Sequence, residues 1–321
     1  MTTSSVVGAT TGVRLPAEAV LDWLRRSPGE PSGFTVVGQR PLTGGLSEGG
    51  IDHVRLDVTG APAAETGLVI KRTGSNEATA LRLLAPLAER SVPELIMSGE
   101  DEQGSWIVTP YYPGEPVGLV GLAPLPVFGT MARVHARYAE RPDLPESLER
   151  IDAEFCRRLL TEFVPESAQQ AGEVGDRAVH WAARLADDRE FLTAPHGFGT
   201  TLLHGDLYGL NVLQPVPARP WPMIIDWNTA RVGPPMFDVA MAGATADDDR
   251  FRTYLAAWTE AAGPVPPPTA LEHAWATALI NAGFAAVVAR RGDPADGAGM
   301  LRTAELAYQA FRAGTTEAAR R

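Results

Sequence analysis

Three side chains with oxygen ligands stand out in the C-terminal half of the chain. Asp206 and Asn211, separated by four residues, lie in a polar run that begins at His204. Asp226 follows the apolar run 222–225, which has the pattern of a short strand. A strand that ends in Asp can place its carboxylate beside that Asn, and two such ligands suit Mg²⁺ when phosphate oxygens complete the shell. An isolated Asp at a strand end is otherwise a turn or cap residue.

Lysine usage points to a second position. The chain has 28 basic residues, and 27 of them are arginine; the single lysine is Lys71. A compact ammonium group differs from the flat guanidinium fork, so one remaining lysine indicates a site that requires it. Alternatively, a single lysine is present by chance in an arginine-rich chain. The position of Lys71 relative to the other candidate residues distinguishes these two explanations.

The composition excludes several classes of protein. Of the 321 residues, 45% are hydrophobic and 21% are charged, which is typical of a globular protein. The net charge of −11 argues against a general nucleic-acid binder, which needs a basic face, and would suit a cationic substrate or simply confer solubility. The single cysteine, Cys156, cannot form an intramolecular disulfide and is predicted to be a buried thiol. We see no signal peptide and expect a cytoplasmic protein without membrane contact.

The elements that must position these residues differ between the two parts of the chain. Before residue 110 the pattern predicts a helix over 15–26, a second helix over 75–87 with Ser75 as its N-cap, and five strands. These strands are predicted at 34–37, 54–58, 68–71, 94–97 and 106–109. The sequence Pro110-Tyr-Tyr-Pro113-Gly114 then interrupts regular structure, so we place a boundary between residues 110 and 111.

The part after this boundary has mainly helical periodicity. Helices are predicted at 125–139, 147–163, 167–191, 248–262, 269–291 and 297–314, around a β-like island at 200–225. The longest apolar stretch, 274–289, is predicted to be a buried helix that is too short to span a membrane. His135, on the first of these helices, is predicted to be a core histidine.

The two motifs together resemble a known family. The run His204-Gly-Asp-Leu-x-x-x-Asn-x-Leu213, followed by Ile225-Asp-Trp-x-x-Ala-x-x-Gly-x-Pro-x-x-Asp-x-Ala240, spans 37 residues. It is similar to the signature pair of aminoglycoside phosphotransferases and their choline-kinase-like relatives, and the Asp-to-Asn spacing equals that of protein-kinase catalytic loops. The resemblance implies an α+β, bilobal protein-kinase-like fold. Its N-terminal lobe, 1–110, would hold a five-stranded antiparallel sheet plus a helix and bind nucleotide. Its larger, mostly helical C-terminal lobe, 111–321, would carry catalysis and bind the substrate.

The resemblance also implies roles for individual residues. Asp206 would be the catalytic base or the carboxylate that orients the acceptor hydroxyl, and Asn211 and Asp226 would bind Mg²⁺. Asp238 would brace the catalytic loop, and His204 would shape it.

The nucleotide would be held mainly by the first lobe. In the kinase plan, Lys71 contacts the α- and β-phosphates and pairs with Glu77, although an acid in the first helical turn also complements the helix dipole. Gly45 and Ser47 lie in a glycine-rich segment that would cover the phosphates or be an ordinary hairpin turn. Tyr111 and Tyr112 would lie at the hinge beside the nucleobase, or simply pack on the core.

Two positions depart from the family pattern. Tyr208 and Asn228 stand where the family commonly has His and often has Glu. Neither is a metal ligand or the base, so these departures bear on substrate identity. The acidic run 247–249 would line a cationic-substrate pocket or, as we favour, cap the following helix.

The predicted function is therefore transfer of the γ-phosphate of ATP or GTP to a hydroxyl of a small molecule, with an antibiotic as the leading acceptor. A metabolite kinase for a sugar, choline, homoserine or a nucleoside is the alternative. A nucleotide-binding pseudokinase is a further hypothesis. The presence of all four polar residues expected of an active kinase, Lys71, Asp206, Asn211 and Asp226, argues against it. A metal hydrolase built on His204, Asp206 and Asp226 is a poor fit, since the sequence lacks a second, spaced histidine pair. Mg²⁺ and the nucleotide are the expected cofactors, and a small hydroxyl compound is the expected partner.

Overall fold

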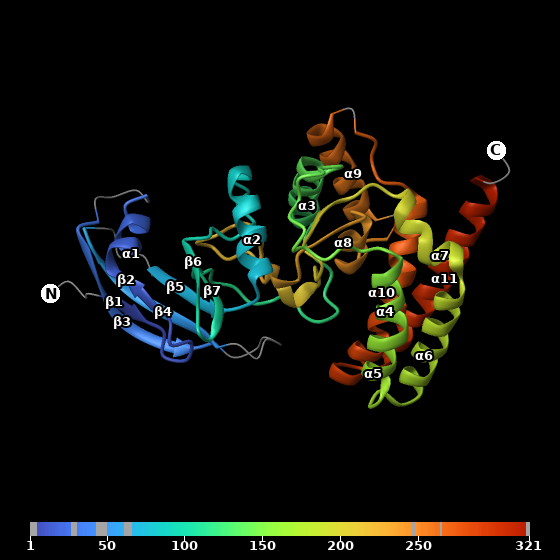
Figure 1. Ribbon diagram of the computed structural model, residues 1–321, viewed down its shortest axis with the longest axis horizontal. Coiled ribbons are helices and arrows are strands. Elements are labelled where there is room, and N and C mark those ends of the chain that lie inside the picture. Colours follow the sequence, from blue (N-terminus) through green and yellow to red (C-terminus); the bar gives the residue numbers. More distant parts are fainter. Residues whose placement is uncertain are drawn as a thin grey trace. The chain divides into compact units, whose positions relative to one another are not determined.

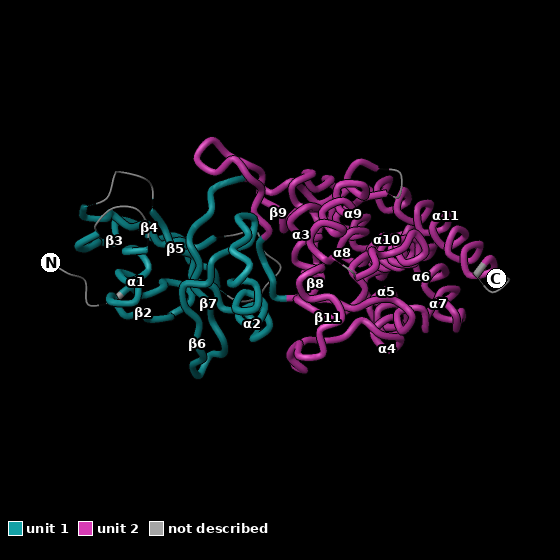
Figure 2. Tube along the Cα trace, turned by 90° about the horizontal axis from the view of Figure 1, so that it is seen from above, with its two compact units in different colours: residues 1–114, 225–228 teal, residues 115–224, 229–321 magenta. Residues whose placement is uncertain are grey.

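The computed structural model describes residues 5–26, 31–42, 50–60, 66–245, 248–263 and 265–318 (Figure 1). The chain forms two compact units, and each is described by itself (Figure 2). Unit 1 comprises Met1–Gly114 and Ile225–Asn228, and unit 2 comprises Glu115–Ile224 and Thr229–Arg321. The break at residue 114 lies four residues beyond the predicted boundary at 110, and the sequence did not predict that 225–228 group with unit 1.

Unit 1 contains a five-stranded antiparallel sheet, as predicted. Its order is β3 (Gly33–Pro41), β4 (Ile51–Thr59), β5 (Thr66–Arg72), β7 (Gly104–Pro110) and β6 (Met97–Asp101). Alternate residues of the central strands, such as Val54 and Leu56 on β4 and Leu68 and Ile70 on β5, are buried in one core cluster. This period of two follows from the pleat, which points successive side chains to opposite faces.

Two sequence predictions in unit 1 were wrong in detail. Strand β6 begins at Met97, where the predicted strand 94–97 ends, and continues to Asp101, which pairs with Gly104 and closes a tight turn. The Asp101 carboxylate accepts the Gln103 backbone N–H there. Helix α2 (Ser75–Leu84) is capped by Gly74 and not by Ser75, and a short 3₁₀ turn, η1 (Ala85–Leu87), completes the predicted helix.

An N-terminal extension packs on the same core. Strands β1 (Ser5–Val7) and β2 (Arg14–Pro16) pair, and helix α1 (Ala17–Leu24) follows directly. The helix is shorter than the predicted 15–26 because residues 14–16 are used in the strand pair. Val20, Trp23 and Leu24 join the core cluster of the sheet.

Unit 2 is mainly helical, with some of the predicted helices divided. Its α-helices are α3 (Leu125–Tyr138), α4 (Ala153–Arg158), α5 (Val164–Ala168), α6 (Gly172–Asp187), α7 (Arg189–Thr193), α8 (Met236–Met241), α9 (Asp249–Ala262), α10 (Ala270–Arg291) and α11 (Pro294–Ala318). The predicted helix 147–163 begins only at residue 153 and ends in a π-helical turn, η2 (Leu159–Phe163). The predicted helix 167–191 is interrupted at Gly172, which has φ +55°, and again at Asp188, which caps α7. A short 3₁₀ segment, η3 (Ala194–Gly197), follows α7.

Helix α10 forms part of the core of unit 2. By length and composition this 22-residue helix could cross a membrane, so the prediction that the stretch is too short was wrong. Its most apolar window is 72% buried inside the protein, where it packs against α11, α6 and α8. The prediction of a buried helix is thus confirmed, as is that of a buried Cys156, whose pKa is raised to about 12 by burial.

Two short ribbons make up the β-like island. Strand β8 (Thr201–Leu203) pairs with β11 (Arg231–Gly233), and β9 (Val212–Leu213) pairs with β10 (Met223–Ile224). The loop after β8 contains Asp206 and the segment after β10 contains Asp226, so these strands fix where each of the two motifs begins.

Candidate functional site

The single lysine lies in an acidic cluster in unit 1. The Nζ atom of Lys71, on β5, is 2.8 Å from Oε2 of Glu77 on α2 and 2.5 Å from Oδ1 of Asp226. The side chains of Lys71 and Glu77 are almost fully buried, at 9% and 5% exposure, while that of Asp226 is 34% exposed. The predicted pairing of Lys71 with Glu77 is therefore present, and Asp226 joins it as a second partner.

Two opposing effects act on the Lys71 ammonium group. Burial lowers its pKa, but the carboxylates of Glu77 and Asp226 outweigh this effect, and the net shift raises the pKa. Lys71 is thus a permanent positive charge, and its most exposed partner, Asp226, is also the predicted metal ligand.

Further hydrogen bonds fix the cluster. Thr73 donates its hydroxyl to Oε2 of Glu77 at 2.7 Å. The backbone N–H of Gly74, at the start of α2, donates to Oδ1 of Asn228 at 3.0 Å, so Asn228 helps to cap this helix. Asp226 has φ +64°, a left-handed conformation that is uncommon for a residue other than glycine. Such strained positions concentrate at functional sites.

Asp206 and Asn211 lie together in unit 2. The side-chain N–H₂ of Asn211 donates to the backbone oxygen of Asp206 at 2.8 Å and to its Oδ2 at 3.0 Å. The five-residue spacing thus brings the two side chains into contact across a turn that ends in a 3₁₀ segment, η4 (Gly209–Asn211). Since the amide nitrogen of Asn211 is used in this way, its amide oxygen is the atom suited to bind a metal ion.

Asp238 holds the loop that contains Asp206. Its carboxylate accepts the backbone N–H of His204 at 2.7 Å and that of Gly205 at 2.9 Å, and Nε2 of His135 lies 3.2 Å away. Burial raises the pKa of Asp238, but these partners outweigh the effect and lower it, so the carboxylate stays ionised. His135 is fully buried and also contacts the Tyr254 hydroxyl at 2.8 Å, which confirms a core histidine.

Several residues that position this loop were not singled out from the sequence. Arg231 donates to the backbone oxygen of Gly205 at 3.3 Å and to Glu149 at 2.8 Å, while Thr229 donates its hydroxyl to the His204 backbone oxygen at 3.2 Å. His204 itself accepts the Asp206 N–H on Nδ1 at 3.2 Å, which agrees with a shaping role. The pairing of β8 with β11 brings these residues together, and only that pairing could have indicated Arg231.

The remaining predicted residues are placed as follows. The ring of Tyr111 stacks on His53 with centroids 3.8 Å apart, and the Tyr112 hydroxyl accepts the Glu94 backbone N–H at 2.9 Å. Gly45 and Ser47 lie outside the described residues.

The acidic run before α9 has the capping role that we favoured. Asp248 is the N-cap of α9, where its carboxylate accepts the Arg250 N–H at 2.8 Å, and Asp249 pairs with Arg252. Asp247 lies outside the described residues.

The donor set fits a hard divalent cation that is shared with phosphate. Among the described residues, no group of three or more His, Cys, Asp or Glu side chains is arranged to hold a metal ion. Asn211 and Asp226 would supply one amide and one carboxylate oxygen, and Mg²⁺ usually takes only one or two protein ligands beside substrate phosphates and water. Amide and carboxylate oxygens are thus the types of donor that Mg²⁺ takes beside a triphosphate.

Solved structures with the same fold include several phosphotransferases. A protein of Ralstonia eutropha, provisionally assigned as an aminoglycoside phosphotransferase, is 16% identical with a TM-score of 0.53; the match covers 92% of this chain and 98% of the other. The GDP complex of wild-type aminoglycoside 2′-phosphotransferase-IIIa is 15% identical with a TM-score of 0.50, covering 85% and 93%. Choline kinase LicA of Streptococcus pneumoniae is 16% identical with a TM-score of 0.50, covering 91% and 98%. No curated protein sequence matches the chain.

A five-stranded antiparallel sheet with a buried Lys–Glu pair, followed by a helical unit with an Asp–Asn loop, defines the class of kinase-like phosphotransferases. The family model for this class matches residues 68–275, and the chain belongs to the phosphotransferase enzyme family. This result confirms the family that the two motifs indicated.

Proposed function

We propose that the protein transfers the γ-phosphoryl group of ATP or GTP to a hydroxyl group of a small molecule. The observation that carries the proposal is the buried Lys71, the only lysine of the chain, held between Glu77 and Asp226. A fixed ammonium beside a partly exposed carboxylate is suited to bind phosphate oxygens together with a metal ion.

Asp206 would act on the acceptor. Its carboxylate is oriented by Asn211 and would take the hydroxyl proton as the acceptor oxygen bonds to the γ-phosphorus. The bond between this phosphorus and the β,γ-bridging oxygen breaks, and the nucleoside diphosphate leaves. Mg²⁺, when bound by Asn211 and Asp226, supplies charge neutralisation on the phosphates. Lys71 adds a further positive charge, so placement and electrostatics provide most of the rate.

The nucleotide side of the proposal involves residues of unit 1. Gly45 and Ser47 would cover the phosphates, and Tyr111 and Tyr112 would lie beside the base. The aminoglycoside 2′-phosphotransferase-IIIa with a similar fold was solved as a GDP complex, so GTP must be tested beside ATP.

For the acceptor we propose an antibiotic, modified in resistance or self-protection. The similar folds are named for aminoglycosides and for choline, and the net charge of −11 suits such cationic compounds. Tyr208 and Asn228 differ from the usual family residues, so the acceptor can differ from those of the named proteins. A metabolite kinase for choline, a sugar, homoserine or a nucleoside is the alternative.

The test is a nucleoside-diphosphate release assay on purified protein. ATP and GTP are each combined with a panel of aminoglycosides, macrolides, choline, sugars, homoserine and nucleosides. We expect release that depends on one class of acceptor, and Asp206→Ala should lower kcat by about 10²- to 10⁴-fold while nucleotide affinity is retained. Nucleotide binding without transfer to any compound would instead support the pseudokinase hypothesis. Near-normal turnover of Asp206→Ala would disprove the role of Asp206.

A further inference from the structure

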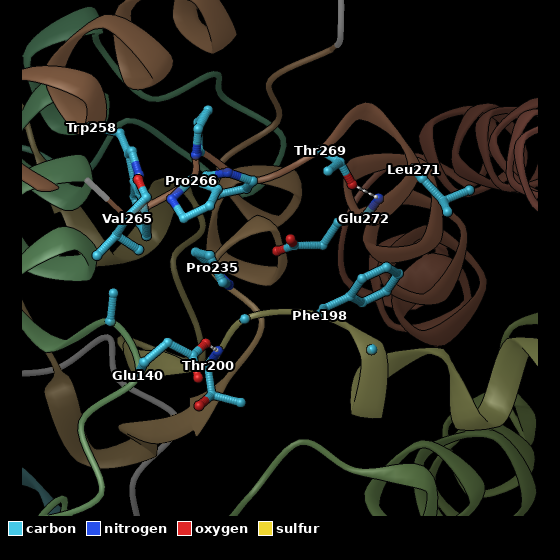
Figure 3. Close-up of a pocket in the computed structure, with 15 residues that line it drawn as sticks. Glu140, Phe198, Thr200, Pro235, Trp258, Val265, Pro266, Thr269, Leu271 and Glu272 are labelled. Carbon is cyan, nitrogen blue, oxygen red and sulfur yellow. Dashed lines mark hydrogen bonds between the residues drawn. The ribbon is translucent and has the colours of Figure 1, made fainter. Parts of the chain in front are cut away.

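Unit 2 contains a cavity of about 480 Å³ whose lining residues come from five segments. Four of these segments are residues 139–140 after α3, the 197–200 loop before β8, Pro235 before α8, and the 265–269 loop with the start of α10, and α9 adds Trp258 (Figure 3). The volume is in the range of small-molecule binding sites.

The cavity combines apolar walls with two acidic groups. Its walls include Trp258, which is 3% exposed, and the proline run 266–268. Glu140 and Glu272 are the only charged residues among those that line it, and no lysine or arginine does so. In Figure 3 the Glu272 side chain extends from α10 towards Pro235, while Glu140 lies beside Thr200.

Glu272 is fixed in place by backbone groups. Its side chain is buried, at 3% exposure, and Oε1 accepts the Met236 N–H at the start of α8, at 3.0 Å. Its own N–H donates to Oγ1 of the N-cap Thr269 at 3.1 Å, so Thr269 and Glu272 have the spacing of a capping box. The Glu272 carboxylate thus accepts backbone hydrogen bonds at the starts of α8 and α10. These bonds fix its conformation in the absence of a ligand.

The two carboxylates differ in exposure, since Glu272 is buried and Glu140 is exposed. Glu140 accepts the Thr200 N–H at 2.9 Å, and within the described parts of the chain neither Glu140 nor Glu272 takes part in an ion pair. Because a buried carboxylate gains most from a cation that shares its low-dielectric environment, the cavity favours a positively charged occupant when Glu272 is ionised.

The cavity is separate from the Asp206–Asn211 pair. In the β8–β11 ribbon, Thr201 pairs with Gly233 at the end next to the cavity, where Thr200 and Pro235 line it. Leu203 pairs with Arg231 at the other end, from which the chain continues to Asp206. A ligand in the cavity would therefore lie at the opposite end of the ribbon from the proposed base.

We propose that this cavity is a second small-molecule site, which binds an organic ammonium ion with its charge on Glu272 and its apolar part against Trp258 and the proline run. The inference does not depend on the proposed function, since none of its residues takes part in the transfer.

The test uses three probes of one shape: hexylammonium, hexanol and hexanoate. Burial raises the pKa of Glu272 to about 8, partly offset by hydrogen bonds from the Met236 and Thr269 backbone. Binding is therefore measured by calorimetry at about pH 8.5, where Glu272 is mostly ionised and an alkylammonium remains protonated. Among titratable groups on other elements, Tyr254 on α9 interacts electrostatically with both Glu272 and Asp238 of α8, and Glu140 lines the same cavity. Asp238 stays ionised and Tyr254 stays neutral at this pH, since their pKa values are lowered and raised respectively.

Hexylammonium should bind about tenfold more tightly than hexanol, and hexanoate should bind most weakly. Glu272→Gln keeps the oxygen that accepts the Met236 N–H, and it should remove the preference for the cation. Glu140→Gln should reduce this preference, while Glu260→Gln, an exposed position on α9 outside the cavity, should leave it unchanged.

Two outcomes would overturn the proposal. One is binding of hexylammonium that is no tighter than that of hexanol, or that is equally tight in Glu272→Gln and Glu140→Gln. The other is binding that is lost in Asp206→Asn but kept in Glu272→Gln, because the probe would then occupy the acceptor site. Failure of the phosphotransfer assay would leave this test unaffected.

Discussion

Lys71 is a buried side chain that also belongs to the proposed nucleotide site. Its ammonium group is buried, yet two carboxylates keep it charged and fix it at the end of the central strand. Arginine could supply the charge, but its planar fork has a different shape and reach, which explains why a lysine remains here in an arginine-rich chain.

Replacing Lys71 should therefore affect stability as well as turnover. Lys71→Met leaves Glu77 and Asp226 without a cation, so we expect the free energy of unfolding to fall by about 2 kcal/mol, less than for a fully buried pair because Asp226 is partly exposed. The double variant Lys71→Met/Glu77→Gln should recover part of this loss. Urea denaturation of both variants is compared with Arg14→Met, which removes an exposed charge from the same unit. Equal losses in the single and double variants would show that Glu77 does not interact with Lys71.

At the scale of the element, the turn after β8 depends on a close backbone approach. Gly205 has φ +80°, and a Cβ atom at this position would lie 2.1 Å from the backbone oxygen of Thr229. Asp238, His204 and Arg231 all bond to this turn, so its conformation is held from several sides. The conformation of this turn therefore determines where Asp206 lies.

Gly205→Ala should consequently disturb both folding and transfer. The left-handed backbone and the clash with Thr229 together should cost about 2–4 kcal/mol of stability, and turnover should fall because Asp206 is displaced. Gly197→Ala is the matched control, since nothing lies within 4 Å of its added Cβ. The stability of both variants is measured by thermal unfolding. The Gly197→Ala control should change the free energy of unfolding by less than about 0.5 kcal/mol. A Gly205→Ala protein as stable and active as the control would contradict the structure of this turn.

For the molecule as a whole, two buried acids make opposite contributions to the pH dependence of stability. The pKa of Asp238 is lowered, because hydrogen bonds from His135 and the loop outweigh burial. The pKa of Glu272 is raised from 4.5 to about 8. Between about pH 4.5 and pH 8 the folded protein therefore holds a proton on Glu272 that the unfolded chain has lost. The contribution of Glu272 is therefore complete below about pH 4.5 and is lost as the pH rises through about 8.

Glu272→Gln should remove this component of the pH dependence. The stability of the variant relative to the native protein should increase with pH between about 5 and 8, by at most about 1.4 kcal/mol per pH unit. Urea midpoints at about pH 5, 7 and 9 test this, with Glu260→Gln expected to show a constant difference. A stability difference that does not change with pH would mean that Glu272 is ionised in the folded protein throughout.

The sequence by itself determined the family, most strands and helices along the chain, and which polar side chains to consider for the site. Local patterns were sufficient for these features. The alternation of Val54, Leu56 and Val58 predicted strand β4, and the spacing of Asp206 and Asn211 matched that of protein-kinase catalytic loops. The resemblance to kinases implied the pairing of the single Lys71 with Glu77, and this pair is present.

Only the tertiary structure decided which distant residues meet. Asp226 pairs with Lys71 across 155 positions, Asn228 caps α2, and Arg231 holds Gly205, and no local pattern encodes any of these contacts. The cavity beside Glu272 is a further example, because its walls come from segments between residues 139 and 272. Such contacts depend on strand pairing and core packing, whose free energies are set by the whole chain, whereas a helix or turn is specified by neighbours a few residues away.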